Sequence, residues 1–197
     1  MVDLKRIALP LSEDVARCLR AGDMVALSGA LVTGRDRVHK HLVEKRPEKS
    51  EIPFDLNGTV LYHCGPVMKK TDEGYRVVAA GPTTSMRVEL YEADVLRQYG
   101  IRGIMGKGGM GRKTLGALQE LGAVYFHTIG GAAVYLADRI RRTAGVWGFE
   151  EFGPTEAMWL FEVEEFPAIV TMDSHGTSLH DRIESDSRDR LQKLLGR

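Results

Sequence analysis

The chain has 197 residues, of which 43% are hydrophobic and 27% are charged, as in an ordinary soluble globular protein. Its 27 basic and 27 acidic residues cancel, so overall charge gives no attraction to nucleic acid or membrane, and we expect neither as a partner. No apolar run approaches the roughly 20 residues of a membrane span, and the charged first residues are unlike a secretory signal. We therefore expect a cytoplasmic protein in which any anion site is a local arrangement of residues.

The first third of the chain is predicted to be rich in strands. Ser12 is placed to cap a short helix, and a longer helix is expected at residues 35–45. The polar segment 44–53 reads as a surface loop inside one domain, because apolar segments resume directly after it. Apolar segments predict strands at residues 3–11, 23–34 and 58–65.

The middle of the chain repeats one pattern three times: an apolar strand, a glycine-containing turn and an amphipathic helix. Gly100 and Gly122 stand where the first two helical patterns stop, as C-terminal glycines do. Strands that alternate with helices imply parallel pairing, which places all the strand-to-helix turns at one edge, where ligands bind. The pattern predicts strands at 75–81, 101–106 and 123–129, and helices at 86–100, 111–122 and 132–145.

The pattern changes after Trp147. Two strands are expected on either side of Pro167, followed by a charged helix at residues 179–196. The whole chain, residues 1–197, is therefore predicted to form a single α/β domain with mixed sheets.

The glycine-containing turns are candidate anion sites. A helix start offers free N–H groups and a partial positive charge, and glycine lets an anion approach the backbone. Thr83 and Thr84 supply hydroxyls at one such start, Arg87 follows one helical turn after Thr83, and Lys107 lies in the next turn. With Arg35 upstream, these cations could clamp two carboxylates, since the planar guanidinium donates two parallel hydrogen bonds to a carboxylate.

Each of these residues also has a purely structural interpretation. The Thr–Thr–Ser stretch resembles an ordinary helix cap, and Arg87 could be a solvated helix residue. No pair of histidines has the spacing of a metal motif, so we expect structural roles for them and no metal ligand in this chain. Cys18 and Cys64 are expected to be buried free thiols.

Residues 106–114, GKGGMGRKT, nearly match the phosphate-binding loop of nucleotide-binding proteins. Gly106 and Gly111 have the required separation, but Arg112 displaces Lys113 by one position. The lysine of that loop must directly follow the last glycine to reach the phosphates. A nucleotide binder of unusual type and a stand-alone anion-binding module therefore remain as alternatives.

Three motifs carry a resemblance to a known family: GRDRVH at residues 34–39, GPTTSMR at 81–87 and GKGGM at 106–110. Together they make the chain resemble, nearly end to end, the β subunit of class I (iron–sulfur) fumarate hydratase and of L-tartrate dehydratase. The resemblance implies a swivelling β/β/α fold of three layers. It also implies an enzyme that reversibly hydrates fumarate to L-malate, with L-tartrate as the alternative substrate.

The same resemblance implies a partner. In that family a [4Fe–4S] cluster is held by three cysteines of the α subunit or N-terminal domain, and its open iron binds the substrate. This chain lacks those cysteines, so it is expected to bind no cluster alone and to form a hetero-oligomer with the α subunit.

The resemblance further implies site residues. Thr83 takes the catalytic position, and Arg35, Arg87 and Lys107 take the substrate-binding positions. Thr84 and Gly108 adjoin them in the same motifs and are expected to contact the dicarboxylate as well. Arg37, two residues after Arg35, is the alternative to Arg35.

Overall fold

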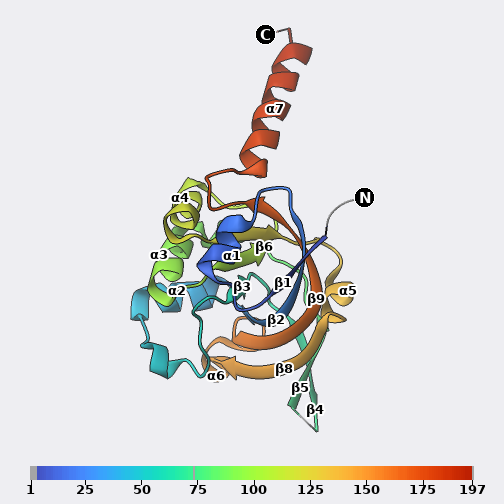
Figure 1. The fold of residues 1–197 in the computed structure, drawn as a ribbon. Helices are drawn as coiled ribbons and strands as arrows, with labels where there is room; N and C mark the ends of the chain where they lie inside the picture. The colour runs from blue at the N-terminus through green and yellow to red at the C-terminus, as the bar shows by residue number, and fades with distance from the viewer. Residues whose placement is uncertain (1–3, 73, 197) are drawn as a thin grey trace.

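The computed structural model describes residues 4–72 and 74–196, and its largest element is a seven-stranded mixed sheet (Figure 1). The first five strands of its spatial order pair in parallel, whereas the last two pair antiparallel. That order is β1 (Leu4–Ala8), β2 (Met24–Thr33), β3 (Val60–Tyr62), β6 (Gly103–Gly106), β7 (Val124–His127), β9 (Met158–Met172) and β8 (Ile140–Trp147).

The long strand β9 closes this sheet on itself. Its second half pairs with β7, its first half pairs with β8, and its other edge pairs with β2 from Val32↔Leu160 to Met24↔Ile169. Strands β2, β3, β6, β7 and β9 therefore form a closed barrel. The closure leaves β1 and β8 as the strands of this sheet that pair on one side only.

Helices cover one face of this barrel. The three that pack there, at the left of Figure 1, are α2 (Asp36–Lys45), α3 (Glu89–Tyr99) and α4 (Arg112–Leu121). Four other helices lie around the body or project from it: α1 (Glu13–Cys18), α5 (Ala133–Ala137), α6 (Phe149–Phe152) and α7 (Leu179–Leu194). The remaining elements are two short 3₁₀ helices and a hairpin: η1 (Lys49–Glu51), η2 (Ser85–Val88), β4 (Val67–Thr71) and β5 (Gly74–Ala79).

Two hydrophobic cores separate three layers. The first lies between opposite walls of the barrel and is built from large side chains such as Tyr62, Phe126 and Trp159. The second lies between the sheet and helices α2, α3 and α4, and contains Leu96 and Leu118. Two β layers and one α layer result, which confirms the predicted α/β fold with mixed sheets.

Several local predictions are also confirmed. The Ser12 hydroxyl accepts a hydrogen bond from the Val15 amide and caps α1. Gly100 and Gly122 end α3 and α4 in the left-handed conformation that favours glycine.

The predicted helix at 132–145 is wrong beyond its first residues. Helix α5 ends at Ala137, and strand β8 begins at Ile140. Arg141 and Arg142 fit this strand because each forms an ion pair with a glutamate of the neighbouring strand β9. The helical pattern of this segment therefore gives way to cross-strand pairing.

Two strand predictions also need correction. The segments on either side of Pro167 form the single strand β9, which passes through Pro167 opposite Ala26. The strand predicted at 75–81 does not join the main sheet. It forms β5, which pairs antiparallel with β4 in a separate hairpin.

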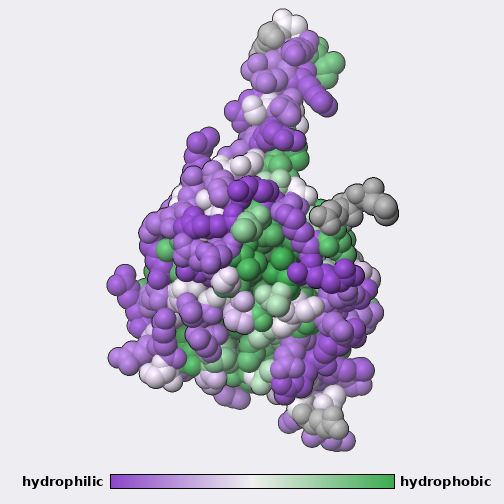
Figure 2. All heavy atoms as spheres, viewed as in Figure 1, coloured by the Kyte–Doolittle hydropathy of each residue, from purple (hydrophilic) through white to green (hydrophobic). Residues whose placement is uncertain are grey.

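Two regions of the surface differ in hydropathy (Figure 2). The C-terminal helix α7 projects from the body and carries mostly hydrophilic residues, whereas apolar residues gather on the body between α1 and the strands behind it. Val15 on α1 and Met24 at the start of β2 are among the exposed apolar side chains. Among the helices of residues 4–72 and 74–196, none is both long and apolar enough to span a membrane.

Candidate active site

The predicted site residues lie at one edge of the barrel. Strands β2, β3, β6 and β7 run parallel, so their carboxyl ends meet at the same edge. Arg35 follows β2 by two residues, His63 directly follows β3, and Lys107 directly follows β6. This common edge brings together motifs that are far apart in the sequence.

Thr83 is fixed to the end of β3. Its backbone N–H and its hydroxyl Oγ1 both donate to the His63 carbonyl oxygen, at 2.7 and 3.1 Å. Its own carbonyl accepts from the Lys107 amide at 3.3 Å, and Thr84 forms a β-bridge with Lys107. The GPTTSMR and GKGGM motifs are therefore hydrogen-bonded to each other, with Thr83 half-buried and Thr84 exposed.

The turn that carries Lys107 depends on glycine. Gly108 and the residue after it have φ angles of +85° and +75°, a region that side chains other than glycine rarely adopt. The Lys107 side chain passes over Gly130, where an added Cβ would lie 3.5 Å from Lys107 Cδ. Across the part of the chain that the structure describes, no carboxylate forms an ion pair with Lys107, so its charge is available to a ligand.

Arg35 and Arg37 have different surroundings. The Arg37 guanidinium donates to two backbone carbonyls of α6 at 3.1 and 3.3 Å, which turns it away from the end of β3. The Arg35 guanidinium instead packs against Gly65, two residues after His63, and its Nε lies 3.2 Å from a Glu156 carboxylate oxygen. Of the two arginines, Arg35 is therefore the one directed toward the segment that holds Thr83.

Arg87 is the most exposed of the predicted cations. Its side chain is 56% exposed, and its Nη2 lies 3.0 Å from Oδ2 of Asp36, the residue next to Arg35. This ion pair connects η2 to the start of α2. The structure thus places all six predicted residues along one rim, while their roles toward a substrate stay predictions.

The start of α4 is occupied by a carboxylate of the chain itself. Glu89 accepts hydrogen bonds from the Gly111 amide at 2.8 Å, the Thr114 amide at 3.2 Å and the Thr114 hydroxyl at 2.7 Å. These are the N–H groups that a phosphate-binding loop would offer to a nucleotide. In the glycine-rich segment 106–114, the N–H groups at the start of α4 are therefore already bound to the Glu89 carboxylate and are not available to a phosphate.

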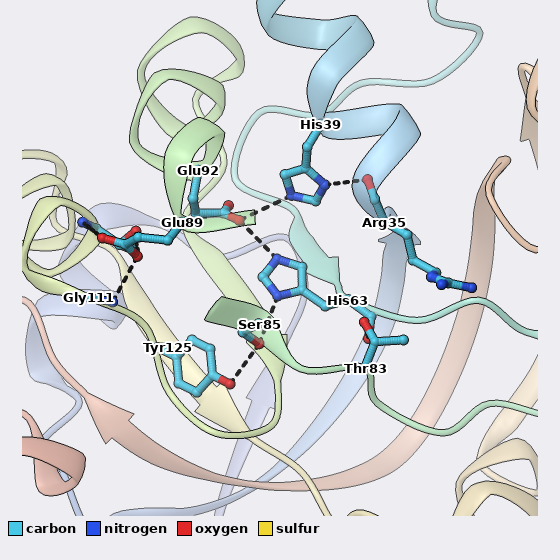
Figure 3. Close-up of polar contacts among 10 residues, drawn as sticks. Arg35, His39, His63, Thr83, Ser85, Glu89, Glu92, Gly111 and Tyr125 are labelled. Carbon is cyan, nitrogen blue, oxygen red and sulfur yellow. Dashed lines mark hydrogen bonds and ion pairs between the residues drawn. The ribbon is translucent and has the colours of Figure 1, made fainter. Parts of the chain in front are cut away.

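A buried polar cluster lies directly beneath the rim (Figure 3). Glu92 Oε2 accepts from His39 Nε2 at 3.1 Å and from His63 Nε2 at 2.9 Å, and all three side chains are at most 1% exposed. His63 Nδ1 continues to the Ser85 hydroxyl at 2.9 Å, which contacts the Tyr125 hydroxyl at 2.9 Å. These side chains therefore form one continuous hydrogen-bonded chain.

For Glu92 and His39, burial and the neighbouring charges shift the pKa in opposite directions. Burial alone would raise the pKa of Glu92, but the two histidines outweigh burial and lower it to about 2. Burial would lower the pKa of His39, yet the Glu92 carboxylate and the Arg35 carbonyl raise it above its ordinary value. Burial together with the charge of His39 lowers the pKa of His63. These shifts favour an ionised Glu92, the protonated form of His39 and the neutral form of His63.

The thiols of this chain do not suit an iron–sulfur cluster. Such a cluster takes several cysteine thiolates, whereas the sequence has only Cys18 and Cys64. Burial raises the pKa of the Cys64 thiol to about 12, so it stays protonated. Cys18 is exposed on α1, contrary to the expectation that both thiols are buried.

Sequence reasoning did not single out Glu89 or Glu92, although a signal was present. Glu92 lies four residues after Val88 and four before Leu96, so it falls on the face of α3 that packs against the sheet. A carboxylate on a buried helix face needs a buried partner, because an unpaired buried charge is costly.

The sequence profile of the family described as Fumarase C-terminus matches residues 1–183. The chain belongs to this family. A relative from Geobacillus stearothermophilus, provisionally named fumarate hydratase class I, is 51% identical over 186 residues. That match covers 94% of this chain but only 35% of the relative, so the chain spans about a third of that protein's length.

Two other relatives have similar lengths to this chain. One, from Methanocaldococcus jannaschii and provisionally named L(+)-tartrate dehydratase subunit beta, is 37% identical over 94% of this chain and 96% of its own length. The L(+)-tartrate dehydratase subunit beta of Escherichia coli K12 is 38% identical over 89% of this chain and 86% of its own length.

Proposed function

We propose that this chain is the β subunit of an iron–sulfur hydro-lyase that reversibly hydrates fumarate to L-malate. Its role is to supply the cations that bind the dicarboxylate and the threonine that takes part in proton transfer. A separate α subunit holds the [4Fe–4S] cluster, because the two cysteines of this chain do not suit one. The 51% identity to a relative named fumarate hydratase class I supports this reaction.

The observation that carries the proposal is the convergence of Arg35, Thr83, Arg87 and Lys107 on one rim. Fumarate is a rigid diacid, and three cations can hold its two carboxylates at a fixed separation. Each charge-assisted contact contributes about 1.5–3 kcal/mol, so losing two of them weakens binding severely. The backbone hydrogen bonds between Thr83 and Lys107 keep a hydroxyl and an ammonium group beside each other.

The chemistry needs electrostatic help at one carboxylate. When malate loses water, a proton leaves C3 and hydroxide leaves C2, and negative charge accumulates on the carboxylate next to C3. The cations of the rim offset that charge, which is where preorganised groups are most effective.

Thr83 is placed to move the proton. Its hydroxyl donates to the His63 carbonyl, which leaves its oxygen lone pairs free to accept a hydrogen bond. A threonine hydroxyl is a weak base, so a group on the partner subunit has to take the proton onward.

The surroundings of the rim support a site that a partner completes. Apolar side chains flank it and remain exposed, as at protein–protein interfaces. Helix α5, which carries two of them, is held beside the segment before Thr83 by a 2.9 Å hydrogen bond from Ala80 N to Ala133 O. The exposed apolar residues are Met86, Leu90, Ile129, Val134 and Tyr135.

L-Tartrate is the second candidate substrate. The relatives whose lengths match this chain are named L(+)-tartrate dehydratase subunit beta, and that name favours tartrate. Both substrates are C4 dicarboxylates that the same cations would bind. They differ in their hydroxyl groups, so a direct comparison of rates decides between them.

The test is anaerobic co-expression with the cysteine-containing α subunit, followed by assays with fumarate and with L-tartrate. We expect the wild-type complex to turn over one of them, and Arg87→Ala combined with Lys107→Ala to lower kcat/KM at least about 100-fold. The matched control is Arg141→Ala with Arg142→Ala on β8, which should leave the rate within about twofold. A cluster-loaded wild-type complex that acts on neither substrate would refute the proposal.

A further inference from the structure

The buried Glu92 lies between the two parts of the chain that carry the candidate catalytic groups. It extends from α3, and its Oε2 accepts from His39 on α2 and from His63 at the end of β3. The three side chains are at most 1% exposed, so bulk solvent screens these contacts little. The roles proposed for the rim residues leave this cluster unused.

The hydrogen bonds fix where the protons lie. His39 Nδ1 faces the Arg35 carbonyl at 2.8 Å, and a carbonyl oxygen can only accept, so Nδ1 carries a hydrogen. His39 Nε2 faces the Glu92 carboxylate, which also accepts. Both ring nitrogens of His39 therefore face acceptors. The His39–Glu92 pair holds one proton more than a neutral imidazole beside an ionised carboxylate would hold.

His63 is satisfied without an extra proton. Its Nδ1 faces the Ser85 hydroxyl, which can donate because it accepts in turn from the Tyr125 hydroxyl. His63 then donates from Nε2 to Glu92 and stays neutral. Gly106 completes the arrangement, because a Cβ at that position would overlap the Ser85 hydroxyl.

Each histidine holds a backbone group of the rim. His39 donates to the carbonyl of Arg35, the residue directly before α2. The carbonyl of His63 accepts both the amide and the hydroxyl of Thr83. Glu92 thereby connects, through two histidines, the points of the backbone from which Arg35 and Thr83 extend.

We propose that Glu92 is a positioning residue, which with His39 and His63 sets the placement of Thr83 relative to Arg35. This inference rests on the proposed function. Proton transfer is sensitive to such placement, since a displacement of about 1 Å can lower a rate about 100-fold. Binding is less sensitive, because the side chains of Arg87 and Lys107, two of the three cations, form no hydrogen bond or ion pair with Glu92 or its two histidines.

The experiment compares Glu92→Gln with wild type in the complete, cluster-loaded α–β complex. Glutamine keeps the size of the side chain, but one of its terminal atoms is a donor and it carries no charge. We expect kcat to fall at least about tenfold while KM for the preferred substrate changes less than about threefold. The control is Val95→Ala on the same helix, which weakens the core without touching the cluster and should leave kcat within twofold.

A second measurement does not depend on activity. Histidine-selective ¹⁵N labelling of the full chain should show, at pH 7, one imidazolium and one neutral buried ring that donates from Nε2. Glu92→Gln should abolish the imidazolium signal. Should that variant fail to fold, Glu92→Asp keeps the charge but shortens the reach, and the same loss of kcat at nearly constant KM is expected.

The outcomes separate the two proposals. If the wild-type complex is inactive on both substrates, the proposed function fails. If the wild-type complex is active and Glu92→Gln loses the imidazolium signal but keeps wild-type kcat, Glu92 has no positioning role. A stoichiometric metal ion that is retained by the wild-type chain and lost in Glu92→Gln would also overturn the hydrogen-bonded arrangement.

Discussion

Two ionic groups at the same edge of the barrel differ in their exposure to water. The side chains of Arg87 and Asp36 are 56% and 37% exposed, whereas Glu92 and its histidines are at most 1% exposed. An exposed pair contributes about 0–1 kcal/mol, so Arg87 can exchange Asp36 for a dicarboxylate at little cost. The buried group cannot exchange partners and instead holds the backbone in place.

The largest expected effect is on the buried side of this comparison. Glu92→Leu leaves two buried histidines without their acceptor and should lower the free energy of unfolding by about 3 kcal/mol. Urea denaturation of the full chain at pH 6 measures this difference. A loss below about 1 kcal/mol would mean that the buried contact is no stronger than a surface pair.

The pH dependence of that loss follows from the two shifted pKa values. The pKa of Glu92 is lowered from 4.5 to about 2, so its contribution is present above pH 4.5 and is lost as the pH falls toward 2. The pKa of His39 is raised above 6.5, so its contribution is complete below pH 6.5 and is lost as the pH rises through the raised value. The difference between wild type and Glu92→Leu should therefore be largest between pH 4.5 and 6.5.

A smaller effect is expected at Thr83, between the two regions. Thr83→Ala should lower kcat about 100-fold and change KM for the preferred substrate by less than about threefold, because the hydroxyl moves a proton and the cations hold the diacid. Steady-state kinetics of the complete complex provide the measurement. If kcat/KM falls only because KM rises, while kcat stays at the wild-type value, Thr83 takes part in binding and not in proton transfer.

The smallest effect is expected on the exposed side. Asp36→Asn should lower stability by less than about 1 kcal/mol and should lower KM by less than about fivefold, because Arg87 no longer has a competing carboxylate. Asp94→Asn, which removes an exposed partner of Lys113 on the helical face, is the matched control and should not change KM. A rise in KM for Asp36→Asn would show that Asp36 assists binding.

Sequence patterns predicted the features that depend on local physics. Helix ends at Gly100 and Gly122 and the cap at Ser12 need only neighbouring residues, and the structure contains them. The edge that gathers Arg35 and Lys107 follows from the parallel pairing of β2, β3 and β6, which is a general rule of such sheets. Thr83 reaches the same edge for another reason, because β5 lies outside that sheet and Thr83 is held by its hydrogen bonds to the His63 carbonyl.

Features that depend on distant partners could not be predicted in the same way. Strand β8 looked helical because its glutamate partners lie on β9, more than a helical turn away in sequence. The sequence pattern predicts a break between strands at Pro167, yet β9 continues through it. There β9 pairs with β2 on one edge but with neither β8 nor β7 on the other, and a strand tolerates the missing N–H of proline at such an edge. The anion at the start of α4 could not be identified from its own segment, since Glu89 belongs to α3.

The double pairing of β9 has a consequence for how the chain acquires its shape. Residues 24–32 of β2 have their antiparallel partners at residues 160–169, so the barrel cannot close until that later segment has been synthesised. Pairings across such sequence separations form slowly, because the intervening loop must be ordered first. During translation, β2 therefore lacks one of its neighbouring strands, and a truncation before residue 160 should yield a product that aggregates rather than a smaller folded unit.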